Sequence, residues 1–227
     1  MPRFLDTRNV DWEVKRAWAS REHEHRVAAP LEGREDLRLA GVAGAAWAAG
    51  LASLMLGDEA SGAEWLRRAA DEYETSWRAA PAGSWGRPIA VLRCRLMAGD
   101  GSGARLAAEA ALEEGALAAE GPIGGYCAAL ALLVLRRDDE AAALAARIVS
   151  EGLDPGSVGV ALGALAGRDE GAFAEARREV LRSFERRNAF LEDVAVADTV
   201  LVLDALARER RMPLEELESE LLPSGRG

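Results

Sequence analysis

Four short segments with a shared pattern recur along this chain, and they constrain its fold more than any other feature. In each one an apolar stretch ends near an aspartate and an amphipathic stretch follows; the four read LMLGDEASGA, LMAGDGSGA, LRRDDEAAA and LAGRDEGAF. Their aspartates are Asp58, Asp100, Asp138 and Asp169, at separations of 42, 38 and 31 residues. Glycine can end a helix in the left-handed conformation, and aspartate can cap the next helix. The pattern therefore predicts an array of stacked helical hairpins, with an aspartate as each N-cap.

The two helices of each predicted hairpin differ in their apolar pattern. The helices after the turns carry apolar stripes at helical spacing, which are Leu66, Ala69, Ala70, Tyr73 and Trp77 in the first and Phe173, Ala176, Val180 and Phe184 in the fourth. The helices before the turns, such as YCAALALLVL and SVGVALGALAG, are apolar nearly all round. A helix of that kind must be covered on more than one side. We expect an inner layer whose second face is covered by the N-terminal helix, a second subunit or a ligand.

The remaining segments complete a predicted single all-α domain. Residues 1–36 should hold an N-terminal helix, 37–211 the hairpins with a fifth inner helix in VAVADTVLVLDALARERR, and 212–227 a short C-terminal helix and tail. Alanine and leucine dominate the apolar residues, and both lose little side-chain freedom in a helix. The fold class that follows is all-α, with antiparallel hairpins in a right-handed solenoid or a compact α/α array.

Charge and composition exclude several classes of function. The net charge is -10 and no basic stripe occurs, so nucleic-acid binding is not expected. The stretch 39–56 has no charged residue and reaches the lower length limit for a membrane span, but its many alanines and glycines favour a buried helix. Cys94 and Cys127 lie in apolar helical surroundings, which predicts reduced thiols in a cytoplasmic protein. Lys15 is the only lysine, which is typical of a GC-rich bacterial genome.

The hairpin turns resemble tetratricopeptide repeats over residues 37–187. That family has a Gly-Asp turn, small residues where the helices cross and proline near the repeat end. The matching positions are Gly50, Gly57, Asp58, Ala63 and Ala70 with one inserted residue, and Gly99, Asp100, Ala104 and Ala111 without one. The third and fourth units keep the aspartate and lose most of the rest. The resemblance implies a helical-repeat fold that binds another protein or a peptide.

The last quarter of the chain resembles a second family. FAEARREVLRSFERRNAFLED, an apolar helix and then RRMPLEELESELLPSG are similar to the ends of some all-α bacterial immunity proteins. Proteins of that kind neutralise a toxin by binding it. The resemblance implies an inhibitor that binds a partner protein.

Few residues are arranged for chemistry. Glu22 and His25 form an ExxH pair on one helix face, and di-iron bundles use two such pairs. The chain has only two histidines, so a homodimer would have to supply the second pair; the alternative is an exposed charged face. Glu192, Asp193 and Asp198 either include a carboxylate pair for acid–base work or simply favour the start of a helix. We expect no catalytic residue and no cofactor.

Tryptophan is the best sequence signal for a binding surface. All six tryptophans lie in the first 85 residues. Trp77 belongs to an inward stripe, whereas Trp85 lies in a link beside Arg87, so this pair and the N-terminal Trp12 and Trp18 are candidates for partner binding. A non-catalytic interaction module is therefore the first functional prediction. A small-ligand binder with an apolar pocket between inner helices and a dimeric di-metal protein are the alternatives.

Overall fold

A computed structural model describes residues 10–30, 33–152 and 157–224, and this part of the chain is all-α, as predicted. The helices are α1 (Trp12–Ala28), α2 (Glu35–Met55), α3 (Glu59–Ala79), α4 (Gly86–Met97), α5 (Gly101–Glu113), α6 (Pro122–Val134), α7 (Asp138–Ser150), α8 (Val158–Gly167), α9 (Glu170–Glu185) and α10 (Asp198–Glu209). Two short 3-10 turns, η2 (Ala116–Ala118) and η4 (Leu191–Asp193), lie in the links.

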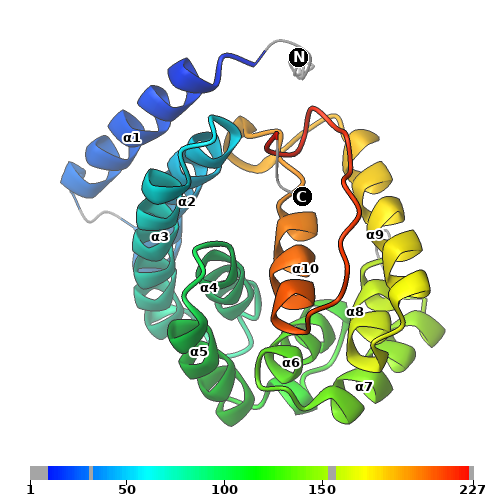
Figure 1. Cartoon of the computed structure of the whole chain (residues 1–227). Helices are drawn as coiled ribbons and strands as arrows, with labels where there is room; N and C mark the ends of the chain where they lie inside the picture. The colour runs from blue at the N-terminus through cyan, green and yellow to red at the C-terminus, as the bar shows by residue number, and fades with distance from the viewer. Residues whose placement is uncertain (1–9, 31–32, 153–156, 225–227) are drawn as a thin grey trace.

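Four antiparallel hairpins, α2/α3, α4/α5, α6/α7 and α8/α9, follow one another around a ring (Figure 1). Both predicted apolar stripes, from Leu66 to Trp77 on α3 and from Phe173 to Phe184 on α9, are buried. Helices α6 and α8 are buried nearly all round, as expected for an inner layer. Helix α2 is long and apolar enough to cross a membrane, but most of that stretch is buried against its neighbours, as in the core of a soluble protein.

The turns confirm the capping prediction at three of the four aspartates. Asp58, Asp100 and Asp169 each accept a hydrogen bond from the backbone N–H three residues later. The prediction for Asp138 is wrong, because the N-cap of α7 is Arg137 and makes no side-chain cap. Asp138 instead accepts a hydrogen bond from the guanidinium of Arg210 at 2.5 Å. A cation from the C-terminal end of the chain therefore takes the carboxylate that the turn would otherwise use.

The predicted fifth inner helix forms as α10, but it does not extend the array. It lies inside the ring and contacts α4, α8 and α9 (Figure 1). Three arginine–aspartate pairs hold it there: Arg93 of α4 with Asp198, Arg177 of α9 with Asp204, and Asp138 of α7 with Arg210. The inner face is thus covered largely by the chain's own C-terminal part, an occupant that the sequence analysis did not foresee. Helix α1 packs instead against α2.

The predicted short C-terminal helix is wrong for the described residues. Residues 212–224, here called the C-terminal strap, run without a helix alongside α9 and α10 (Figure 1). Arg177 donates a hydrogen bond to the Glu215 carbonyl at 2.9 Å, and the Ala197 N–H donates to the Leu221 carbonyl at 2.9 Å. Leu221 and Leu222 are buried. An extended chain rises about twice as far per residue as a helix, so a short segment can follow the full length of both helices.

The link between α9 and α10 closes the ring. Glu192 in η4 accepts hydrogen bonds from both terminal nitrogens of Arg26 of α1, at 2.7 and 3.0 Å. The Glu192 carboxylate also lies against Gly44 of α2, where an added Cβ would come within 2.9 Å of it. The last hairpin is thereby joined to the first, and α10 and the C-terminal strap lie between them.

Candidate functional site

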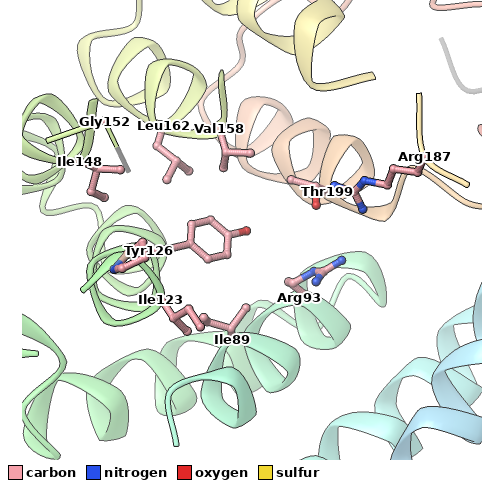
Figure 2. A pocket seen from close by; sticks show the side chains of 12 residues that line it. Ile89, Arg93, Ile123, Tyr126, Ile148, Gly152, Val158, Leu162, Arg187 and Thr199 are labelled. Atoms are coloured by element: carbon pink, nitrogen blue, oxygen red, sulfur yellow. The ribbon is translucent and has the colours of Figure 1, made fainter. Parts of the chain in front are cut away.

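A cavity of about 570 Å³ opens between the inner helices on one side of α10. Its wall is formed by α4, α6, α8 and α10 with the end of α7, the link after α7 and the link after α9. It comprises Ile89, Arg93, Pro122, Ile123, Tyr126, Ile148, Gly152, Val158, Gly159, Leu162, Arg187 and Thr199. Figure 2 shows the aliphatic side chains gathered at one end. Ile123 is more than half exposed, so the cavity communicates with solvent there. Its size and apolar wall are those of a small-molecule site.

The opposite end of the cavity is polar. Figure 2 shows the Tyr126 ring crossing the cavity, with its hydroxyl directed toward the end where Arg93, Thr199 and Arg187 lie. A second cavity of about 260 Å³ lies beyond the same three residues. Its wall adds aromatic side chains, among them Trp47 and Phe190. Arg93 and Arg187 therefore line both cavities.

Arg93 is only partly paired. Its terminal nitrogen donates to the Asp198 carboxylate at the start of α10. Its Nε is buried and has no hydrogen-bond partner within the described residues. A buried donor without an acceptor costs about 1–3 kcal/mol, more when the group is charged. Arg93 therefore lines the cavity with one terminal nitrogen bonded to Asp198 and with an Nε that no described residue accepts from.

Arg187 has an aromatic neighbour but no acceptor in the described part of the chain. Its guanidinium stacks over the Phe184 ring, 3.5 Å from the ring centre. Burial lowers the pKa of Arg187, and the positive charge of Arg93 lowers it further. An arginine stacked in this way keeps its N–H edges available for hydrogen bonding. The two cations thus face the same end of the cavity and repel each other.

The Tyr126 hydroxyl and the two thiols of the chain stay neutral at neutral pH. Burial raises the pKa of Tyr126, although the charge of Arg93 opposes the shift. Burial also raises the pKa of the Cys94 and Cys127 thiols to about 12, and both cysteines are buried and unpaired, as the sequence predicted. A thiol of this kind is a poor nucleophile. The chemistry near the cavity is therefore that of hydrogen bonding and apolar contact.

The predicted partner-binding residues lie on two separate elements. Trp85 precedes α4 and is partly buried, and an added Cβ on Gly124 of α6 would lie 3.3 Å from its ring. Arg87 is half-buried, and its Nε has no partner within the described residues. Trp12 and Trp18 lie on α1, where Trp12 packs partly against the core and Trp18 stays exposed under Lys15. The role of these four residues in partner binding stays a prediction.

Of the predicted metal ligands Glu22 and His25, the first is bound to an arginine instead. Glu22 accepts a hydrogen bond from Arg26 at 2.9 Å, and His25 is exposed. No group of three or more His, Cys, Asp and Glu ligands occurs within residues 10–30, 33–152 and 157–224. The structure instead buries His23, whose Nε2 lies 2.6 Å from the Glu72 carboxylate and whose ring meets Trp65 edge-on. Its position four residues after the buried Ala19 is the signal that the sequence analysis missed.

The proposed acid–base carboxylates are not brought together. Glu192 binds Arg26 and Asp198 binds Arg93. The sequence analysis missed both cavity arginines. Arg93 interrupts the apolar run IAVLRCRLM of an inner helix, and this interruption is a usable signal. Arg187 lies in a charged stretch and offers none.

Comparison with known proteins gives no further assignment. No family model matches the chain, and no significant match is found among curated proteins or solved structures.

Proposed function

We propose that this protein binds a small, largely apolar molecule in the cavity of about 570 Å³. The single observation that supports this most is the cavity itself, which has aliphatic walls, a solvent opening and a few polar groups gathered at one end. Those are the features of a ligand site. This was the second of the three functions considered from the sequence.

The filled ring favours this function over peptide binding along the inner face. In an open helical-repeat array the concave surface is the usual binding surface. Here α10 and the C-terminal strap lie across it. A cavity remains where a long groove would have been, and it suits a small molecule better than a helix or an extended peptide.

The wall favours binding over catalysis. Among the described residues its polar side chains are those of Arg93, Tyr126, Arg187 and Thr199, and these include no carboxylate, histidine or thiol. General acid–base or nucleophilic catalysis would draw on such groups. We place the ligand-binding protein in a bacterial cytoplasm, because its two thiols are buried and reduced and its composition is arginine-rich.

Thermal unfolding in the presence of hexanol, octanol, decanol and the matching carboxylates tests the proposal. A ligand that binds only the folded state stabilises it by about 2.7 kcal/mol at a hundredfold excess over its Kd. We expect Ile123→Trp to reduce this stabilisation, because the larger side chain at this wall position occupies space that the ligand would fill and so weakens its affinity. Leu106→Trp is the matched control, since Leu106 is an exposed residue of α5 that does not line the cavity. The proposal fails if no probe stabilises the protein, or if both variants behave alike.

A partner protein is the second candidate function, and one observation favours it. Val14 and Trp18 lie four residues apart on α1, and both expose apolar side chains. This strip, together with the tetratricopeptide-like turns, suits docking of another chain, including the toxin partner of an immunity-type inhibitor. The test is pull-down from the native host followed by repetition with Val14→Asp. Leu106→Asp, at an equally exposed apolar position on α5, should keep any specific partner.

A further inference from the structure

Two guanidinium groups approach the same end of the cavity from distant parts of the chain. Arg93 comes from the inner helix α4, and Arg187 comes from the link after α9. Figure 2 shows both groups directed toward this end, with the Tyr126 hydroxyl pointing the same way. The planar fork of arginine matches a carboxylate, and two forks can hold one carboxylate from two sides.

Arg26 is an example of an arginine in this chain that makes several hydrogen bonds. Arg26 donates to Glu22, to the Gly41 carbonyl and twice to Glu192. Arg93 by contrast makes one such bond and keeps a buried, unpartnered Nε, and Arg187 donates to no acceptor within the described residues. An unpartnered Nε also occurs at Arg38, Arg87, Arg95 and Arg210, so what distinguishes this end of the cavity is that two incompletely paired guanidinium groups meet there.

The charge at this end of the cavity is also uncompensated. Within the described residues, Arg93, Arg187 and Asp198 are the charged residues in the walls of the two adjoining cavities. One carboxylate neutralises one guanidinium, which leaves a single positive charge. Burial and the nearby charge of Arg93 both lower the pKa of Arg187, as expected for two cations held together without an anion. One negative charge would complete the group.

We propose that the ligand carries one carboxylate, bound between Arg93 and Arg187, on an apolar body that lies against Ile89, Ile148 and Leu162. This inference rests on the proposed function and specifies its ligand class. The hydroxyls of Tyr126 and Thr199 line the same end and can donate to the carboxylate. The aliphatic end then binds the apolar body. A medium-chain fatty acid or a similar monocarboxylate has this combination of one charged head group and an apolar chain.

Calorimetric titration with four molecules that share one alkyl chain tests the head group. The probes are decanoate, decanol, decyltrimethylammonium and decyl phosphate. At about pH 7 we expect decanoate to bind about tenfold or more tightly than decanol, because a hydrogen bond to a charged group is worth more than a neutral one. The ammonium should bind most weakly. Decyl phosphate should bind no better than decanoate, because the site has one positive charge to neutralise.

Two substitutions with opposite expected effects on decanoate affinity separate head-group binding from loss of structure. Arg187→Gln should lower decanoate affinity to about that of decanol, and leave decanol unchanged. Asp198→Asn should raise decanoate affinity, because it removes the carboxylate that competes for Arg93. A merely structural change would weaken both probes in both variants. Arg186→Gln is the matched control, since Arg186 pairs with Glu179 on the surface and does not line the cavity.

The outcomes distinguish this inference from the function on which it rests. Equal binding of decanol and decanoate would overturn the carboxylate assignment and leave an apolar ligand site standing. Tighter binding of decyl phosphate would overturn it in favour of a dianion. Absence of binding by all four probes would overturn the proposed function as well. Decanoate selectivity that Arg187→Gln abolishes and Arg186→Gln preserves would support the inference.

Discussion

Two of the three arginine–aspartate pairs that join the array to α10 differ in how completely their hydrogen bonds are satisfied. Arg177 donates two hydrogen bonds to the Asp204 carboxylate, at 2.5 and 2.8 Å, and a third to the Glu215 carbonyl. Its side chain is 4% exposed and that of Asp204 is 7% exposed. Arg93 makes one bond to Asp198, and its side chain is 25% exposed at the edge of a cavity.

The difference separates a structural pair from a pair that can also serve a ligand. A buried charge whose partner is removed remains uncompensated, whereas a charge beside a cavity can gain water. A saturated guanidinium has nothing further to offer, but a partly paired one can bind an incoming anion. The stability of variants at each pair tests this distinction.

The saturated pair should be the most sensitive. We expect Arg177→Met to lower the free energy of unfolding by about 3–5 kcal/mol, because it leaves the Asp204 carboxylate buried and unpaired. Urea unfolding measures the change. The double variant Arg177→Met, Asp204→Leu should recover most of the loss, since apolar residues can replace a buried pair at little cost. A single-variant loss below about 1 kcal/mol would contradict the comparison.

The third tie to α10 should be intermediate. The Arg210 side chain is fully buried, and it donates to Asp138 and to the Leu133 and Leu206 carbonyls. Burial lowers the pKa of Arg210, but the guanidinium stays charged at neutral pH. Asp138→Asn removes its carboxylate and should cost about 2 kcal/mol. Asp139→Asn, at the exposed neighbouring position, should cost close to nothing in the same urea titration; equal losses would show that Arg210 does not depend on Asp138.

Loss of the cavity pair should cost the least of the three. We expect Arg93→Gln to lower stability by only about 1 kcal/mol: the Asp198 side chain is itself only 5% exposed, but it lines the second cavity and lies in the first turn of α10, where the helix dipole favours a carboxylate, and the Gln amide can still donate to it. The same variant should lose decanoate selectivity in calorimetry. A stability loss as large as that of Arg177→Met would make Arg93 a structural residue and remove the contrast.

Raising the pH above about 9 should lower the free energy of unfolding, because Cys94 and Cys127 are buried, whereas these thiols should have no effect on stability at neutral pH. Burial raises the pKa of Cys94 and Cys127 to about 12 from a usual value near 9. Above pH 9 the unfolded chain loses these protons and the folded chain keeps them, so stability falls as pH rises. The slope should reach about 1.4 kcal/mol per pH unit for each thiol. Urea unfolding between about pH 8 and 11 measures it; Cys94→Ala should reduce the slope, and Arg93→Gln should preserve it.

The local parts of this fold were predictable because their causes lie close together in the sequence. Helical spacing of the apolar residues gave the buried stripes on α3 and α9, and the Gly-Asp turns gave the caps at Asp58 and Asp100. The errors come from long-range pairing. Asp138 does not cap α7, and its carboxylate instead accepts a hydrogen bond from Arg210, which lies far along the chain. The C-terminal segment, expected to be helical, extends because Arg177 and Ala197 bind its backbone.

The candidate site was predictable only as a type. Apolar inner helices implied an inner face that needs covering, and a ligand pocket was one of the alternatives considered. Its polar end was not predictable, because Arg93 and Arg187 meet only through the placement of α10 inside the ring. No spacing rule links an inner helix of the second hairpin to a link beyond the fourth.

The closure between Arg26 and Glu192 has a consequence for how the chain comes apart. Open arrays of repeats have stabilities that are roughly a sum over nearest neighbours, and their end units fray or can be deleted. Here α1 is ion-paired with the segment that follows the last hairpin, so neither end of the hairpin array is free to fray. Removing one hairpin would open the circle and expose α10 to water. Such a chain should unfold as one cooperative unit.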